Sequence, residues 1–450
     1  MQVVPHQAGT KTNRFLFIAS DWRWAMTWPG GIAGYIDSLA RGLMSLGDTV
    51  RMLAVVRPDE EGQIDFLKKY ESWAIPFHLA HDDKPTNWLG RKCVSLLEIL
   101  RCLSPNCRRV LERGSIFKAS TASISRFERI LSDQKPTAIV FGNFDVRLYP
   151  LALSLLERRR PYGIIAHGCE ICRLPSNKKN DLIIRETMLK GASWIAANSR
   201  HTERLLETWR ISSERIKVVH PPISEEAMRE SAVLESTSNK DEDFRLVTIC
   251  RLVNGKGIDL VLRALKILTA RGIPYRYVIG GDGPERGLLD GLVDELGLRD
   301  KVRFQGSVEG QEKWRLLWNA DVFVMSSRFI AAISSPWQES FGIAFAEAAA
   351  FGIPAVGSRS GGIPDAVIDG KTGILVPEES PQDLADALTY LYRNPQTRKQ
   401  MGEAARERAR RQFSPTAIAA RFRDEAARAA RQSSETDGQT HWRWPAEPEM

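Results

Sequence analysis

At 450 residues the chain is too long for one ordinary hydrophobic core, so we expect two domains of roughly 200 residues each. Its 43% hydrophobic and 26% charged residues are typical of a soluble globular protein, and no apolar run reaches the roughly 18 residues that a membrane span needs. The net charge of +8 is uneven, because residues 1–222 hold 33 Lys and Arg against 22 Asp and Glu, or +11, and the remainder holds 30 against 33, or −3. A basic half is compatible with nucleic acid, anionic lipid or a pyrophosphate-bearing acceptor, and charge alone does not choose among them.

Cysteine usage and the N-terminal sequence favour a cytoplasmic protein. The six cysteines are sparse for this length and form no disulfide framework, and no charged and then apolar secretion signal opens the sequence. Cys169 and Cys172 form a Cys-x-x-Cys pair, but no second pair follows at zinc-finger spacing. We therefore expect neither a structural metal nor redox chemistry at this pair.

The first predicted elements form a strand–loop–helix–strand unit. Residues 14–20 are predicted to form an apolar strand of the kind buried in a parallel sheet, and residues 49–56 a second one. Between them a loop over 21–31 ends in Gly30 and Gly31 and opens an amphipathic helix. Loops at the carboxyl ends of strands bind ligands in open α/β sheets, but two glycines can equally make a plain tight turn.

The segment 57–135 gives the weakest pattern. Within it, residues 88–113 intersperse apolar side chains with Arg and Lys. This composition suits either a helix on an anionic membrane surface or a core-facing helix with a solvated basic face. Both readings stay open, and only the first predicts a peripheral membrane contact.

Two further buried strands are expected at 137–141 and 162–166. The second ends at His167, at the carboxyl edge of a parallel sheet where chemistry is usually placed. An imidazole there can hydrogen-bond a ligand hydroxyl, although core and loop histidines are also common. Another strand, beginning at Trp194, leads into a helix for which Ser199 is the expected cap.

The second half begins with a strand that carries Arg251 to the edge of a sheet, and Lys256 follows in a Gly-Lys-Gly turn at the start of a helix. Two cations beside a helix N-terminus suit a pyrophosphate group, although a surface turn with a solvated lysine is the alternative. A later Gly-x-Gly turn has Arg286 where a dinucleotide-binding fingerprint needs its third glycine, so the signal for a nicotinamide cofactor is weak.

The most unusual segment, 341–351, is apolar on every side, as in a fully buried helix, and contains Glu347 as its only ionisable group. Glu339 lies two helical turns earlier, ahead of a helix start where N–H groups are free and the dipole is positive. Gly342 lets a ligand approach the backbone closely. These features predict an anion site with a carboxylate at each end, suited to a nucleoside diphosphate sugar. The alternative is a helix-start charge plus a core carboxylate paired with an arginine.

Glu339 and Glu347, separated by seven residues, resemble the E-x7-E motif of family 4 retaining glycosyltransferases, which have the GT-B fold. The glycine-rich runs 353–365 and 369–373 are similar to the donor domain of that family. The resemblance implies an α/β protein of two doubly wound, Rossmann-like domains facing a cleft. The expected parts are an acceptor-side domain at 1–222, a linker at 223–243, a nucleotide-sugar donor domain at 244–415, a helix at 416–431 that crosses back to the first domain, and a disordered tail at 432–450.

The same resemblance implies the site residues. Glu339 and His167 would be the catalytic residues that contact the transferred sugar, and Glu347 would bind the ribose. Because the cations of this site belong to the protein and no Asp-x-Asp motif is placed for the purpose, we expect no metal ion and no other cofactor. The residues implied in donor binding are Arg251, Lys256, Glu347, Ser340, Phe341, Gly342, Ile343, Val308 and Gly31.

The implied activity is a retaining hexosyl transfer from a UDP- or GDP-linked donor to a saccharide or lipid-linked acceptor, in polysaccharide or glycolipid assembly. It would take place in the cytoplasm or at the inner face of the membrane, with no nucleic acid partner. A nucleotide-sugar epimerase and a non-catalytic nucleotide-sugar-binding protein of the same fold remain as alternatives. The loop 326–338 is longer than the usual connection of the family, which leaves open a different placement of Glu339 or a lid over the donor.

Overall fold

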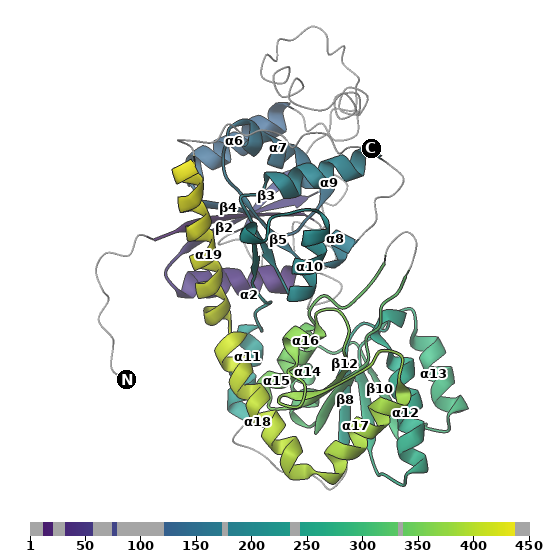
Figure 1. The fold of residues 1–450 in the computed structure, drawn as a ribbon. Helices are drawn as coiled ribbons and strands as arrows, with labels where there is room; N and C mark the ends of the chain where they lie inside the picture. The colour runs from purple at the N-terminus through teal and green to yellow at the C-terminus, as the bar shows by residue number, and fades with distance from the viewer. Residues whose placement is uncertain are drawn as a thin grey trace, which may run out of the picture.

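The computed structural model describes residues 12–20, 32–56, 74–78, 121–172, 179–234, 244–331 and 336–436. Figure 1 shows two lobes, each built on a sheet with helices packed against it. Neighbouring strands run parallel in both sheets, and each sheet is extended in both directions from its first strand. The predicted fold class, two doubly wound α/β domains, is confirmed.

The first lobe holds a seven-stranded sheet in the order β3-β2-β1-β4-β5-β6-β7. Successive apolar side chains of its strands point alternately into two cores, as the two-residue period of a strand requires. Leu16 and Ile18 enter the cluster on one face of the sheet, and Phe15 and Phe17 enter the cluster on the other. The strands are β1 (Arg14–Ser20), β2 (Thr49–Val56), β3 (Ala74–His78), β4 (Ala138–Phe141), β5 (Gly163–Ala166), β6 (Trp194–Ala197) and β7 (Ile216–Val218). The helices are α2 (Ile32–Ser45), α6 (Thr121–Gln134), α7 (Tyr149–Glu157), α8 (Cys169–Cys172), α9 (Lys179–Gly191) and α10 (Arg200–Thr208), with 3-10 turns η4 (Val146–Leu148) and η5 (Ser213–Arg215).

The second lobe holds a six-stranded sheet in the order β10-β9-β8-β11-β12-β13. Its strands are β8 (Arg245–Ile249), β9 (Arg276–Gly280), β10 (Val302–Gly306), β11 (Val322–Met325), β12 (Ala355–Ser358) and β13 (Gly373–Val376). The helical elements are η6 (Asn254–Lys256), α12 (Ile258–Ala270), α13 (Arg286–Glu295), α14 (Gly310–Trp318), α15 (Ile343–Ala350), α16 (Ile363–Ala366), α17 (Pro381–Arg393) and α18 (Pro395–Gln412). Strands β8 and β11 direct alternate side chains into two cores, one on each face of the sheet, which accounts for their near-continuous apolar sequences.

The segment expected to be a linker, 223–243, contains helix α11 (Glu225–Leu234). Ile223 and Ala227 are fully buried in the core cluster that also contains residues of α14 and α15. Packing therefore stabilises a helix whose own sequence shows little periodicity, as is common for short helices.

The last helix, α19 (Pro415–Thr436), returns to the first lobe and lies beside α2 (Figure 1). Phe422 on α19 packs on the first sheet, with its ring centroid 5.9 Å from that of Phe17 and 5.0 Å from that of Trp194. A side chain at Gly42 would overlap the Pro415 carbonyl, so a glycine allows α2 and α19 to cross closely. The helix continues to Thr436, five residues beyond its expected end, and 437–450 lie outside the described residues.

Candidate active site

The candidate site lies where the strand order of the second sheet reverses. The first strand β8 and its neighbour β11 form the centre of this sheet, and later strands are added on either side. Ligands of open α/β sheets bind outside the carboxyl ends of the strands at such a point. The loop after β8 carries Arg251 and Lys256, and the loop after β11 leads to Glu339.

Backbone contacts hold these two loops together. Gly257 has a φ of +62°, and a Cβ there would overlap the carbonyl oxygen of Ser326 just after β11. The N–H of Arg328 donates to the carbonyl oxygen of Gly255 over 2.9 Å. Only glycine fits at position 257, so the turn that bears Lys256 is fixed against the segment that leads to Glu339.

Lys256 and Glu339 form an ion pair inside this edge. Their side chains are 17% and 13% exposed, so both charges are largely removed from water. Burial lowers the pKa of Lys256, but the Glu339 carboxylate outweighs it and leaves the pKa above its ordinary value. The lysine is therefore a cation, and its carboxylate partner neutralises it in the absence of a ligand.

Cys250 lies beside this pair, at the end of β8. Burial raises the pKa of its thiol to about 12, with smaller opposing effects from Lys256, which lowers it, and Glu339, which raises it. A thiol is a nucleophile only when ionised. Cys250 is therefore a packing residue of the site at neutral pH.

Helix α15 begins beside Glu339 and provides the backbone N–H groups of the site. Gly342 precedes it with a φ of +87°, and its first turn contains no acidic residue. Gly362 N–H donates to the Glu339 carbonyl oxygen over 2.8 Å, and a Cβ at Gly362 would overlap the Ser340 carbonyl. The glycine turn ahead of α16 thus fixes the start of α15, where free N–H groups and the helix dipole favour an anion.

Glu347 lies within α15 and is ion-paired with Lys313 on α14. Glu347 Oε1 lies 2.7 Å from Lys313 Nζ, and the side chains are 9% and 13% exposed. The Lys313 ammonium also lies 4.7 Å from the centroid of the Trp314 ring. The cation that a buried Glu347 requires is thus a lysine that our sequence analysis did not identify.

His167 follows β5 in the first lobe and is held in one tautomer. Its Nε2 lies 2.8 Å from the Gly142 carbonyl oxygen, so Nε2 must carry the proton because a carbonyl only accepts. The His167 backbone N–H donates to Glu170, and the Tyr35 ring packs edge-on at 5.1 Å. In the neutral ring, Nδ1 remains as the acceptor for a hydroxyl group.

The His167 loop reaches the start of α15 across the two lobes. Gly168 has a φ of +100°, and a Cβ there would lie 2.5 Å from Ser340 Oγ and 2.8 Å from Thr202 Oγ1. Any larger residue would be strained and would push Ser340 away. The predicted residues His167 and Ser340 are therefore brought together, although they come from different sheets.

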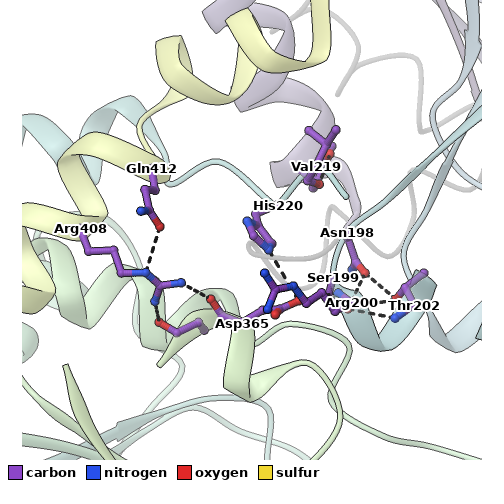
Figure 2. Close-up of polar contacts among 11 residues, drawn as sticks. Asn198, Ser199, Arg200, Thr202, Val219, His220, Asp365, Arg408 and Gln412 are labelled. Atoms are coloured by element: carbon purple, nitrogen blue, oxygen red, sulfur yellow. Dashed lines mark hydrogen bonds and ion pairs between the residues drawn. The ribbon is translucent and has the colours of Figure 1, made fainter. Parts of the chain in front are cut away.

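A second contact between the lobes centres on Asp365 of α16 (Figure 2). Its carboxylate accepts the backbone N–H of Arg200, the first residue of α10, and His220 Nε2 lies 3.6 Å from the same oxygen. Arg408 of α18 donates to the backbone carbonyls of Asp365 and Ala366 and thereby holds α16 in place. An acidic side chain of the second lobe thus sits at the helix N-terminus of the first, where the dipole favours it.

The remaining predicted residues differ in what they offer a ligand. Phe341 is 2% exposed, and its ring stacks on His220 at 5.3 Å, so only its backbone is available. Val308, after β10, is 7% exposed and packs toward Gly280. Arg251 is exposed at the end of β8, and Ile343 is the first residue of α15. Gly31 and the basic segment 88–113 lie outside the described residues.

No helix within the described ranges is both long enough and apolar enough to cross a bilayer. Among the same residues, no group of three or more His, Cys, Asp or Glu is placed to hold a metal ion.

Two family models cover most of the chain. The model "Glycosyltransferase Family 4" matches residues 29–227, and "Glycosyl transferases group 1" matches residues 232–408. The chain belongs to glycosyltransferase family 4. The first matched region contains β2 to β7 of the first sheet, and the second contains the whole second sheet and the E-x7-E segment.

Curated relatives are similar over part of their length. A D-inositol 3-phosphate glycosyltransferase of Paenarthrobacter aurescens is 31% identical over 228 residues, which cover 49% of this chain and 54% of the relative. A GDP-mannose-dependent alpha-(1-6)-phosphatidylinositol monomannoside mannosyltransferase of Mycolicibacterium smegmatis is 36% identical over 164 residues, or 36% of this chain and 42% of the relative. The chain spans about half the length of the curated relatives that it matches.

Solved structures share the whole GT-B fold. HepE of Anabaena in complex with UDP has a TM-score of 0.67 at 17% identity, and the alignment covers 92% of this chain and 100% of HepE. UDP-GlcNAc 2-epimerase of Neisseria meningitidis bound to UDP-GlcNAc has a TM-score of 0.54 at 16% identity, with 92% and 100% covered. At such identities the likeness concerns the fold alone, which transferases and an epimerase share.

Proposed function

We propose that this protein transfers a hexosyl group from a nucleoside diphosphate donor to a hydroxyl acceptor, with retention of configuration at the anomeric carbon. The Lys256–Glu339 ion pair at the start of α15 carries the proposal. The pair supplies a cation and a carboxylate at the carboxyl edge of a doubly wound sheet, and the start of α15 beside it supplies backbone N–H groups. A diphosphate linked to a polyhydroxyl group needs these three kinds of partner.

The roles follow from where charge develops. As the glycosidic bond breaks, negative charge grows on the diphosphate leaving group, and Arg251, Lys256 and the α15 N-terminus neutralise it. Glu339, released from Lys256 by the incoming phosphate, accepts hydrogen bonds from the hydroxyls of the transferred sugar. His167 positions that sugar from the other lobe through its free ring nitrogen.

Glu347 has a separate role at the nucleoside end of the donor. We propose that its carboxylate accepts hydrogen bonds from the ribose hydroxyls. Lys313 is the present ion-pair partner of that carboxylate. The base would lie near the backbone of Val308, at the edge formed by β9 and β10. The donor is thus expected to extend from Val308 in the second lobe to His167 in the first.

The nucleotide panel is the first test. UDP-, GDP- and ADP-linked sugars should be screened by thermal shift, and the matching donor should stabilise the protein by about 2.7 kcal/mol at a hundred times its Kd. Glu347→Ala should weaken that donor about ten- to a hundredfold, because a hydrogen bond to a charged group contributes about 1.5–3 kcal/mol. Titration calorimetry of the variant measures this loss.

Glu403→Ala is the matched control for this panel. Glu403 is 62% exposed on α18, so the same substitution there should leave donor affinity unchanged. A wild-type protein that no nucleoside diphosphate sugar stabilises would contradict the proposed function. An unchanged affinity in Glu347→Ala would remove the ribose assignment alone.

Stereochemistry and turnover separate the proposed transferase from its alternatives. With an α-linked donor and a suitable acceptor, proton NMR of the first product formed should show the α-anomer. A β-linked product would contradict retention. Conversion of the donor sugar without any acceptor would indicate an epimerase, and binding without turnover would indicate a non-catalytic protein.

A further inference from the structure

We propose that Trp337 is a positioning residue that holds the Lys256 ammonium in place for the donor diphosphate. The inference rests on the proposed function and adds to it a residue outside the E-x7-E segment. It comes from the longer loop that follows β11, and it uses only the described residues of that loop.

The Trp337 ring is seated directly on the turn that bears Lys256. A Cβ at Gly255 would overlap two ring carbons, Cε3 and Cζ3, so the indole occupies the space that any other residue at 255 would fill. The Lys256 ammonium lies 5.4 Å from the ring centroid, within the range of a cation–π contact. Among the described residues, Lys256 therefore contacts both the indole face and the Glu339 carboxylate.

The backbone explains why the two partners converge. Trp337 and Glu339 are two residues apart, and in an extended segment such residues point to the same side. Ile330 and Trp337 exchange backbone hydrogen bonds of 2.9 and 3.0 Å, which fixes Trp337 in an extended pairing. The other strand of this pair is anchored, because Phe329 N–H donates to Glu378 over 2.9 Å and Arg328 pairs with Asp259.

The two contacts differ in what an incoming phosphate does to them. A phosphate competes with Glu339 for the N–H groups of Lys256, whereas the indole face takes no hydrogen bond and can be kept. The ring thus keeps the ammonium at the turn while its N–H groups change partner from carboxylate to phosphate. Because less of the side chain must be reordered on binding, the diphosphate binds more tightly.

Substitutions at 337 separate this role from simple packing. Trp337→Phe retains an aromatic face, and Trp337→Leu retains apolar bulk without one. Titration calorimetry with UDP, GDP and ADP should give about tenfold weaker binding of the recognised nucleotide to Trp337→Leu, and a loss within about threefold for Trp337→Phe. In turnover, the Leu variant should raise KM for the donor more than it lowers kcat.

Two further variants complete the experiment. Phe329→Ala is the matched control, since Phe329 lies on the same loop with its side chain 49% exposed, and it should leave nucleotide affinity unchanged. Gly255→Ala places a methyl group where the indole lies and should displace the ring. It should weaken nucleotide binding as much as Trp337→Leu does, so it can replace Trp337→Leu in the test if Trp337→Leu does not fold.

The possible results separate the role of Trp337 from the proposed function. Wild-type protein that binds none of the three nucleotides would overturn the proposed function, and the role of Trp337 with it. Wild-type binding that Trp337→Leu and Gly255→Ala both retain would overturn the positioning role alone. Equal losses in the Phe and Leu variants would reduce Trp337 to a packing residue and would also overturn it.

Discussion

Lys256→Met should destabilise the protein by about 3 kcal/mol and abolish measurable sugar transfer. Removal of one partner of a buried ion pair leaves an uncompensated charge, which costs about 3–5 kcal/mol, and the partial exposure of Glu339 places this case at the lower end. Urea unfolding at pH 7 measures the stability, and transfer from the donor found in the nucleotide panel measures the activity.

The double variant Lys256→Met/Glu339→Gln separates stability from function. With both charges removed, more than half of the lost stability should return, because the double variant no longer buries the uncompensated carboxylate that Lys256→Met leaves behind. Activity should not return, since the diphosphate has lost its cation and the sugar its carboxylate. A double variant as unstable as Lys256→Met would show that the pair is not the source of the effect.

Lys399→Met is the control for the loss of a lysine as such. Lys399 pairs with Glu403 over 3.9 Å on α18, and the two side chains are 71% and 62% exposed. Exposed pairs contribute at most about 1 kcal/mol, so this variant should unfold within that margin of the wild type. The contrast between the two lysines would show that burial gives the Lys256 pair its effect.

Strand β8 and the buried helix α15 of the second lobe could be predicted because their patterns are local. The apolar run that precedes Arg251 gives β8, and the all-apolar segment around Glu347 gives α15. The positions of Glu339 and Glu347 relative to α15 follow from one continuous stretch of sequence. This part of the candidate site was therefore predictable without any knowledge of the other lobe.

The partners of those carboxylates could not be predicted in the same way. Lys256 lies 83 residues from Glu339, and Lys313 lies 34 residues from Glu347, so only the packing of the sheet identifies the pairs. A buried carboxylate indicated that a cation was needed, but the sequence offered Arg and Lys at many positions. Lys313 itself lies on α14, beside the buried Trp314, in a pattern that any surface-covering helix shows.

Contacts between the lobes also could not be predicted from the sequence. Asp365 stands in a glycine-rich run that fits the family pattern, but nothing near it indicates that it meets Arg200 in another domain. Helix α11 was missed for a related reason, because Ala227 and Ile223 are buried by neighbours distant in sequence rather than by their own helix. Long-range packing decided both features.

Asp365→Asn should destabilise the protein by about 2 kcal/mol at neutral pH. The substitution keeps the size of the side chain but removes the charge on the carboxylate that accepts the Arg200 N–H at the start of α10. A hydrogen bond to a charged group contributes about 1.5–3 kcal/mol. Urea unfolding measures the loss, and faster hydrogen exchange at the Arg200 amide would locate it. Asp386→Asn is the control, because Asp386 pairs with Arg271 but is 54% exposed, and we expect an effect below about 1 kcal/mol.

The pKa of Asp365 determines how the stability that its carboxylate contributes changes with pH. Burial raises the pKa of Asp365, but His220 and the N–H and charge of Arg200 outweigh it, so the pKa lies below its ordinary value. A lowered pKa in the folded state gives stability that is complete above the ordinary aspartate pKa of about 3.9 and is lost as the pH falls through the folded value. The difference in unfolding free energy between wild type and Asp365→Asn should therefore be retained from neutral pH down to about pH 5 and shrink below about pH 4. A difference that stays constant into acid would mean that the carboxylate of Asp365 does not stabilise the contact between the two lobes.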